Sequence, residues 1–99
     1  DAITAYEYCV AINDRFSPAY FNMGNAQLTL EQYKESIESF ERCIEIDGDD
    51  PLTYCYLGEA NEQLNNLTIA WDFYQKALSM SPTLAEAWLG LGIVTDLQG

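Results

Sequence analysis

Histidine is absent from this sequence of 99 residues, and basic residues are scarce, with four lysines and arginines against 16 aspartates and glutamates. Without histidine, the chain lacks the commonest general base and metal ligand. The net charge of −12 disfavours binding to phosphate backbones and to anionic membrane surfaces. We therefore expect no enzyme activity, no metal or other cofactor, no nucleic-acid partner and no membrane partner.

Cysteine pairs and long apolar runs are also missing. No apolar run approaches the roughly 18 residues of a transmembrane helix. The three cysteines, Cys9, Cys43 and Cys55, form no CxxC motif. We interpret them as small buried thiols, with a disulfide or redox role as the less favoured alternative. A reducing compartment fits this pattern, and we expect a cytoplasmic location.

One short block occurs three times, at residues 20–26, 54–60 and 88–94. It consists of a large aromatic residue, a large aliphatic residue three positions later, a glycine and, two positions after the glycine, a small residue. The interval from Gly24 to Gly58 equals the interval from Gly58 to Gly92, and Cys9 and Cys43 are separated by the same interval. A fixed period of this length, about 34 residues, is typical of a repeat architecture in which neighbouring units share one continuous core.

Apolar residues at three- and four-residue spacing predict six α-helices with short connections, and hence antiparallel neighbours. The expected ranges are 1–13, 18–30, 33–46, 51–64, 68–80 and 84–97. Ser17 before Pro18 and Asp50 before Pro51 are predicted N-caps followed by proline at the first helical position. The sequence Asp47-Gly48-Asp49-Asp50 is expected to cap and turn the chain, because Pro51 and Gly58 stand where a calcium loop needs oxygen ligands.

Side-chain size predicts how these helices pack. A mid-helix glycine costs about 1 kcal/mol relative to alanine, so its repetition indicates close approach of another helix. We expect Phe40 and Tyr74, which are one repeat period apart, to pack against the part of the neighbouring helix where the glycine leaves no side chain. In the fifth helix the predicted buried residues are Ala70, Trp71, Tyr74, Ala77 and Leu78. In the first helix the apolar residues at helical spacing are Ala2, Tyr6, Cys9, Val10 and Ile12.

These blocks resemble the tetratricopeptide repeat, whose signature is W-x2-L-G-x2-Y followed by A-x3-F and P. The first part appears three times, as Tyr20-x2-Met23-Gly24 and its two later counterparts, and the second as Ala70-x3-Tyr74 and two related sequences. The resemblance implies an all-α superhelix, or solenoid, of antiparallel helix pairs. The chain then divides into a second helix (1–16), two full repeats (17–50 and 51–84) and a further first helix (85–99), which we interpret as part of a longer protein.

The resemblance also implies a concave groove, lined by the first helix of each repeat, that binds a peptide or a helix of another protein. The groove positions in this sequence are Phe21, Asn22, Asn25, Leu28, Cys55, Tyr56, Glu59, Glu62, Leu89, Ile93 and Asp96. One subclass of the family holds an acidic chaperone tail with Lys, Arg and Asn at such positions. Asn25 matches one member of that clamp at most, because the basic members are absent. We therefore expect a neutral, apolar or basic peptide.

Two other roles remain open from the sequence. The segment could be a structural spacer or regulatory part of a larger multidomain protein, and only a binding experiment separates this role from peptide recognition. Helical-repeat RNA binding is disfavoured by the charge. Because the first and last helices expose apolar residues, Trp88, Leu91 and Leu97 among them, we also expect head-to-tail self-association.

Overall fold

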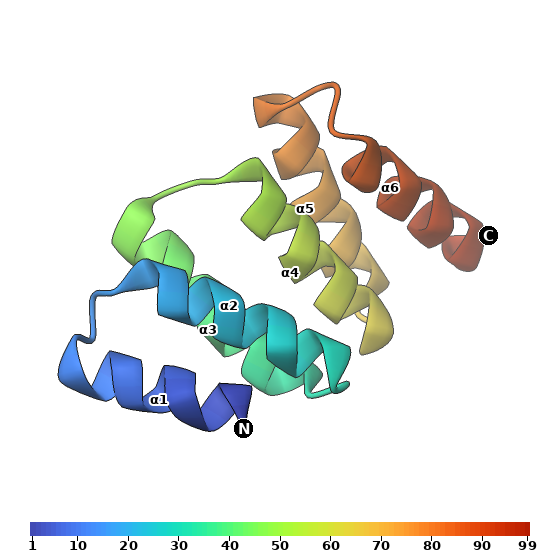
Figure 1. Cartoon of the computed structure of the whole chain (residues 1–99). Coiled ribbons are helices and arrows are strands. Elements are labelled where there is room, and N and C mark those ends of the chain that lie inside the picture. The colour runs from blue at the N-terminus through green and yellow to red at the C-terminus, as the bar shows by residue number, and fades with distance from the viewer. The chain divides into compact units, whose positions relative to one another are not determined.

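The computed structural model describes all 99 residues as six α-helices joined by short turns (Figure 1). The helices are α1 (Ala2–Ile12), α2 (Ser17–Thr29), α3 (Tyr33–Asp47), α4 (Pro51–Gln63), α5 (Leu67–Met80) and α6 (Ala85–Gln98). Each helix begins and ends within one position of the predicted bounds, so the helix assignment from periodicity is confirmed. Contacts gather the helices into two compact units, residues 1–48 and residues 49–99.

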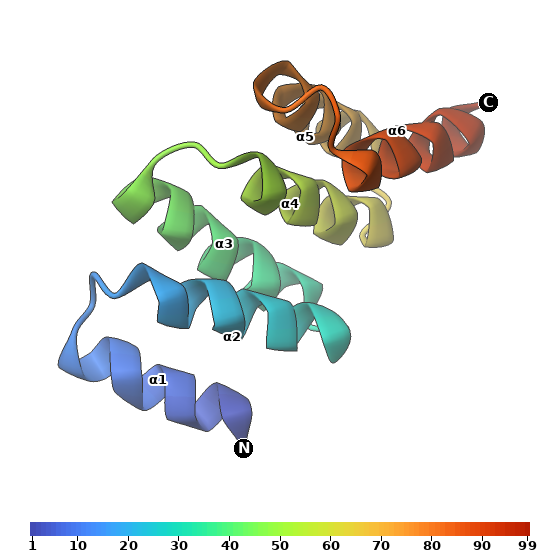
Figure 2. The same ribbon diagram turned by 45° about the horizontal axis from the view of Figure 1, so that its top comes forward.

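In the first unit, α2 and α3 form an antiparallel pair, and α1 lies beside α2 (Figure 2). The Phe40 ring of α3 is fully buried. A Cβ atom at Gly24 would lie 2.8 Å from Phe40 Cε1, which is closer than a real Cβ comes to carbon. The Ser36 hydroxyl donates to the Gly24 carbonyl at 3.0 Å. Glycine therefore permits the close approach that its repetition predicted.

The apolar residues at helical spacing in the first helix form α1, but none of them is fully buried. α1 contacts only α2, and Ile12 in its last turn is 87% exposed. Tyr6, Cys9 and Val10 are half-buried. A single neighbouring helix covers only part of a helical face, so periodicity here identified the apolar side but not the degree of burial.

One of the two predicted N-caps is confirmed and the other is wrong. Asp50 caps α4, with its carboxylate accepting from the Thr53 backbone N–H at 2.9 Å. Ser17 instead lies inside α2, which has Phe16 as its N-cap residue and no side-chain cap. The Ser17 hydroxyl donates to the Asp47 carboxylate at the end of α3 and does not accept from the N–H groups of its own helix.

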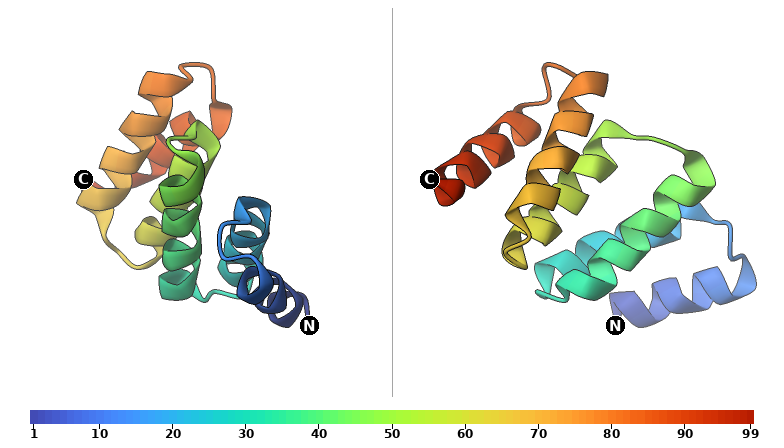
Figure 3. Two further views of the ribbon diagram at one scale, coloured as in Figure 1. Left: turned by 90° about the vertical axis from the view of Figure 1, so that its left-hand side faces the viewer. Right: turned by 180° about the vertical axis from the view of Figure 1, so that it is seen from behind.

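In the second unit, α4 and α5 form the antiparallel pair and α6 lies beside both (Figure 3). Tyr74 of α5 is buried, and a Cβ atom at Gly58 would lie 2.9 Å from its Cε1 atom, as predicted. Trp71 is 38% exposed, so its predicted burial is wrong. The buried face of α5 runs through Ala70, Tyr74 and Ala77, and Trp71 lies beside that line.

A candidate peptide-binding groove in residues 49–99

The second unit has a depression of about 320 Å³ on the side where α4 and α6 meet above α5. Its lining consists of Cys55, Tyr56, Glu59, Glu62 and Gln63 from α4, Tyr74 from α5, and Glu86, Leu89, Gly90 and Ile93 from α6. We call this depression the α4–α6 groove. It combines apolar side chains with carboxylates and contains no basic residue.

The contact between Tyr74 and Gly90 fixes the floor of the groove. A Cβ atom at position 90 would lie 2.2 Å from Tyr74 Cζ, so only glycine lets α6 come this close to α5. The Tyr74 hydroxyl donates to Glu62 Oε1 on α4 at 2.9 Å. One side chain thus contacts both walls. Burial, followed by the hydrogen bond to Glu62, raises the pKa of Tyr74, so the phenol stays protonated.

The charge of the groove comes from Glu59, Glu62 and Glu86. Burial raises the pKa of Glu59, and the nearby Glu62 carboxylate adds to this shift. The raised pKa means that the negative charge on Glu59 destabilises the folded protein. A cation placed in the groove would offset this effect. No group of three or more metal-ligating side chains in the chain is arranged to hold a metal ion.

The thiol of Cys55 and the ring of Tyr56 form the α4 side of the groove beside these carboxylates. Cys55 is 5% exposed, and burial, with Glu59 and Glu86 as smaller contributors, raises the pKa of its thiol to about 11. Burial also raises the pKa of Tyr56. Both groups are therefore neutral at pH 7, and neither provides a nucleophile or a positive charge.

The apolar side of the groove comes mainly from α6. Leu89 is 68% exposed and Ile93 is 41% exposed, one helical turn apart. Large aliphatic side chains that project into a concave surface can take up the apolar side chains of a ligand. The groove therefore offers two kinds of contact, apolar from α6 and anionic mainly from α4.

The structure brings six of the predicted groove residues together: Cys55, Tyr56, Glu59, Glu62, Leu89 and Ile93. Asp96 is exposed on α6 but is not among the lining residues of this depression. A role for any of these residues in binding remains a prediction.

The four other predicted residues lie on α2 in the first unit. The Phe21 ring meets Phe40 edge-to-face at 5.8 Å between centroids, which is a packing contact. The Asn25 amide donates to the Phe21 carbonyl on its own helix at 3.2 Å. Asn22 is exposed and Leu28 is half-buried. Their contact with a ligand also remains a prediction.

The list of predicted groove residues does not include Gln63, Tyr74, Glu86 and Gly90, which also line the depression. The spacing could have indicated Gly90, because Gly90 follows Tyr74 by the same number of residues as Tyr74 follows Gly58. The repeat period instead drew attention to Gly92, whose surroundings are open.

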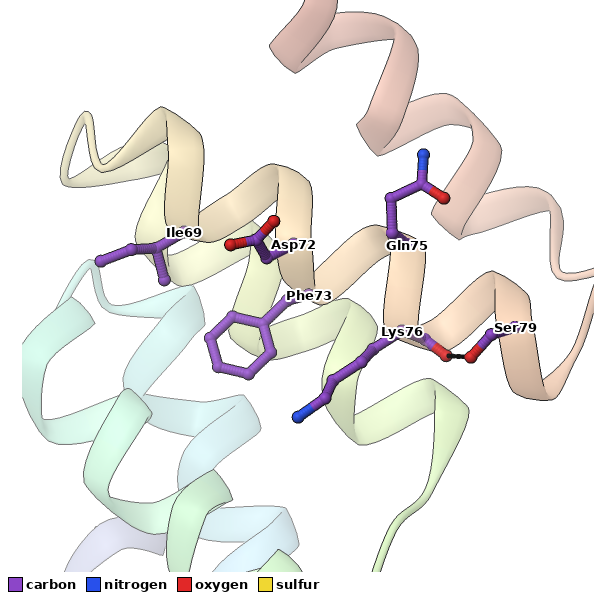
Figure 4. A pocket seen from close by; sticks show the side chains of 6 residues that line it. All are labelled: Ile69, Asp72, Phe73, Gln75, Lys76 and Ser79. Carbon is purple, nitrogen blue, oxygen red and sulfur yellow. Dashed lines mark hydrogen bonds between the residues drawn. The ribbon is translucent and has the colours of Figure 1, made fainter.

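Lys76 is the single basic residue in 49–99, and it lies on α5 outside the groove. It lines a separate hollow on α5 with Ile69, Asp72, Phe73, Gln75 and Ser79 (Figure 4). Its ammonium group lies over the Tyr54 ring, 5.0 Å from the centroid. Lys76 therefore lies away from Glu59, Glu62 and Glu86, and no basic residue lines the α4–α6 groove.

The tetratricopeptide repeat models match residues 17–50 and 53–84. The chain belongs to the tetratricopeptide repeat family. A curated relative, the protein CTR9 homolog of Arabidopsis thaliana, is 36% identical over 73 residues, which cover 74% of this chain and 7% of that protein. The first curated relatives are all much longer, and the chain spans 7% to 12% of their lengths.

Solved structures of tetratricopeptide domains share the all-α repeat solenoid, which confirms the predicted fold class. The crystal structure of MamA superposes with a TM-score of 0.92 at 25% identity, covering 98% of this chain and 57% of that one. The second such domain of human RPAP3, in complex with the HSP70 peptide SGPTIEEVD, gives a TM-score of 0.89 at 22% identity, with 94% and 78% covered. None of the six helices here has the length and apolar character needed to span a membrane.

Proposed function

We propose that this tetratricopeptide segment is a non-catalytic interaction module whose α4–α6 groove binds a peptide carrying both basic and apolar side chains. The observation that carries the proposal is the composition of the groove, in which Glu59, Glu62 and Glu86 lie beside Leu89 and Ile93 with no basic residue among them. Repeats of this fold bind peptides in solved structures, as the RPAP3 complex illustrates.

The charge of the groove argues for one class of peptide over another. The peptide in the RPAP3 complex ends in the acidic sequence EEVD. Such a tail would approach three carboxylates here, and like charges at short distance repel each other. A lysine or arginine would instead neutralise Glu59, whose pKa is raised by burial and by Glu62. The groove therefore selects against acidic tails.

A pair of synthetic peptides tests the proposal. Both have the same leucines at the same positions, and the charged positions are lysine in one and glutamate in the other. Fluorescence anisotropy should show binding of the lysine peptide and none of the glutamate peptide. Binding of the lysine peptide should weaken as the pH falls through the raised pKa of Glu59, because the protonated carboxyl no longer attracts a cation.

Two variants and a control locate the site. Glu59→Gln removes one groove charge, and Leu89→Ala removes an apolar contact; each should weaken binding about tenfold. Glu41→Gln removes the same charge from a position on α3 outside the groove and should leave the affinity almost unchanged. Equal binding of both peptides, or equal effects of Glu59→Gln and Glu41→Gln, would overturn the proposal and favour a spacer role.

A further inference from the structure

Residues 1–48 contain a depression of their own, about 600 Å³ in volume, lined by α1, α2 and α3. α1 and α3 both pack on α2 and do not contact each other, so the depression lies between them, and we call it the α1–α3 groove. Its lining residues on α2 are Tyr20, Met23 and Gln27. They lie on a different face of α2 from the positions that the resemblance assigns to the concave groove.

Gln27 is a buried residue of this groove with two unused hydrogen-bond donors. The residue is 8% exposed, and its Oε1 atom accepts from the Ser39 hydroxyl of α3 at 2.7 Å. Its amide nitrogen, Nε2, makes no hydrogen bond. Every fully enclosed side-chain nitrogen or oxygen in the chain has a partner, so Nε2 must reach the surface of the groove. An acceptor from outside can therefore bind there.

The second repeat has a different arrangement at the same positions. Asn61 stands one repeat period after Gln27, and its amide donates to a carbonyl of its own helix at 2.8 Å. Phe73 stands one repeat period after Ser39 and stacks on Tyr54, with 5.8 Å between the ring centroids. The repeat therefore folds without a pair like Gln27 and Ser39. The unused donors belong to this groove and are not a requirement of the fold.

The walls of the groove carry negative charge. Three exposed carboxylates line them: Glu7 on α1, and Glu35 and Glu38 on α3. Arg42 is the single basic residue in the lining, and it already has partners. Its guanidinium lies 2.9 Å from the Glu45 carboxylate and donates to the Asp14 carbonyl at 3.1 Å. The groove thus offers buried donors together with unpaired carboxylates.

We propose that the α1–α3 groove binds an extended, basic segment of another protein. A backbone carbonyl of the segment accepts from Gln27 Nε2, and its lysine or arginine side chains lie against Glu7, Glu35 and Glu38. A small polycation would match the carboxylates but has no acceptor for the amide. A helix uses most of its carbonyls internally, whereas an extended segment leaves them free.

A blocked peptide of alternating lysine and proline is the probe, because proline keeps it extended and leaves carbonyls available. It has no large apolar side chain for Leu89 and Ile93. Leucines in the α1–α3 groove would lie against Gln27 and Ser39, so a leucine-bearing peptide is expected in the α4–α6 groove instead. NMR titration of the ¹⁵N-labelled chain with the lysine–proline peptide should shift the amides of residues 7–11, 20–27 and 35–42 saturably.

A double variant tests the buried donor. Gln27→Met with Ser39→Ala removes both partners of the internal hydrogen bond, so neither is left unpaired, and urea unfolding establishes that the variant is folded. It should bind the peptide about fivefold more weakly than the unchanged chain. Spermine, a polycation without a carbonyl, should bind both proteins equally. Equal losses for the peptide and spermine, or no loss for the peptide, would overturn the role of Gln27.

A single substitution on the surface tests the charge. Glu38→Gln should weaken peptide binding about threefold, whereas Glu41→Gln, on the same helix but outside the groove, should have almost no effect. Equal effects of the two substitutions would mean that the peptide follows the net charge of the chain and would overturn the proposal.

The location of the shifts separates this site from the α4–α6 groove. Glu59→Gln should leave binding of the lysine–proline peptide unchanged, because the two grooves share no lining residue. Shifts confined to residues 55–63 and 86–93, or none at millimolar peptide, would overturn the proposal. Either groove can therefore fail its test while the other still binds its ligand.

Discussion

The Tyr74 ring of α5 lies directly against Gly90 of α6, with Tyr74 Cζ 2.2 Å from the point where a Cβ atom of residue 90 would lie. The same ring also covers Gly58 of α4, where the corresponding closest distance is 2.9 Å. Tyr74 therefore lies between two glycines on different helices. This ring holds α4 and α6 at the separation that creates the groove.

Substitution at Gly90 should therefore destabilise the protein, although alanine is the better helix former. Gly90→Ala gains about 1 kcal/mol of helix propensity but forces the buried Tyr74 ring to move, at a typical cost of about 1–3 kcal/mol. Gly92→Ala has the same propensity gain, and apart from the adjoining backbone of α6 and the two neighbouring residues no atom lies within 4 Å of the added Cβ, so it should stabilise the protein. Urea unfolding of both variants in dilute solution gives the comparison. Equal effects of the two substitutions would mean that Tyr74 does not constrain α6.

A cation–aromatic pair recurs in the two full repeats. The Arg42 guanidinium lies 5.7 Å from the Tyr20 ring centroid, and one repeat later the Lys76 ammonium lies 5.0 Å from that of Tyr54. Lys76→Met keeps the aliphatic stem and removes the charge, so it should lower the free energy of unfolding by about 0.5–1 kcal/mol. The double variant with Tyr54→Leu completes a thermodynamic cycle, and a coupling energy of zero would refute the interaction.

Periodicity predicted the six helices well because each apolar stripe, proline and cap residue acts locally. The pairs Gly24–Phe40 and Gly58–Tyr74 were also predictable, since a destabilising glycine repeated in phase needs a packing reason. Local signals did not determine how much of a face is covered. Trp71 and Ile12 are apolar residues in helical phase, yet their exposure depends on which helices lie opposite.

The candidate groove was predictable to a similar extent. The resemblance placed Tyr56, Glu59 and Leu89 on one side of their helices, and all three line the α4–α6 groove, because position within a repeat fixes the direction of a side chain. It did not identify Gly90, whose importance depends on a contact with α5 of the preceding repeat. Nor did it show that the Asn25 amide bonds to its own helix.

Thiol reactivity should differ among the three cysteines. Cys55 is buried with a pKa raised to about 11, and Cys43 is also buried, whereas Cys9 on α1 is half-buried. At pH 8 a disulfide reagent should modify one thiol per chain quickly and the other two only as fast as the structure opens. Mass mapping identifies the modified positions, and Cys9→Ser removes the fast phase. Rapid modification of Cys55 in the native state would contradict its burial.

The pH dependence of stability should reveal the destabilised carboxylate in the groove. Because the folded pKa of Glu59 is raised, its contribution to stability is fully present below the ordinary value of 4.5 and is lost as the pH rises through the folded value. Glu59→Gln should thus be more stable than the unchanged chain at pH 7, and the difference should shrink towards acid pH.

The matched control for this measurement is Glu41→Gln, which removes the same charge from a position on α3 outside the groove. Subtracting its effect on the free energy of unfolding removes the general stabilisation that comes from making the net charge of −12 less negative. If Glu59→Gln and Glu41→Gln shift the free energy of unfolding equally at every pH, the groove does not destabilise its carboxylate.

The most direct test of the central claim is a titration of the ¹⁵N-labelled chain with the lysine–leucine peptide, followed by NMR. We predict saturable shifts concentrated in the amides of residues 55–63 and 86–93, and no shifts with the matched glutamate–leucine peptide. Shifts spread over the outer faces of α3 and α5, or none at millimolar peptide, would contradict a basic-peptide groove between α4 and α6.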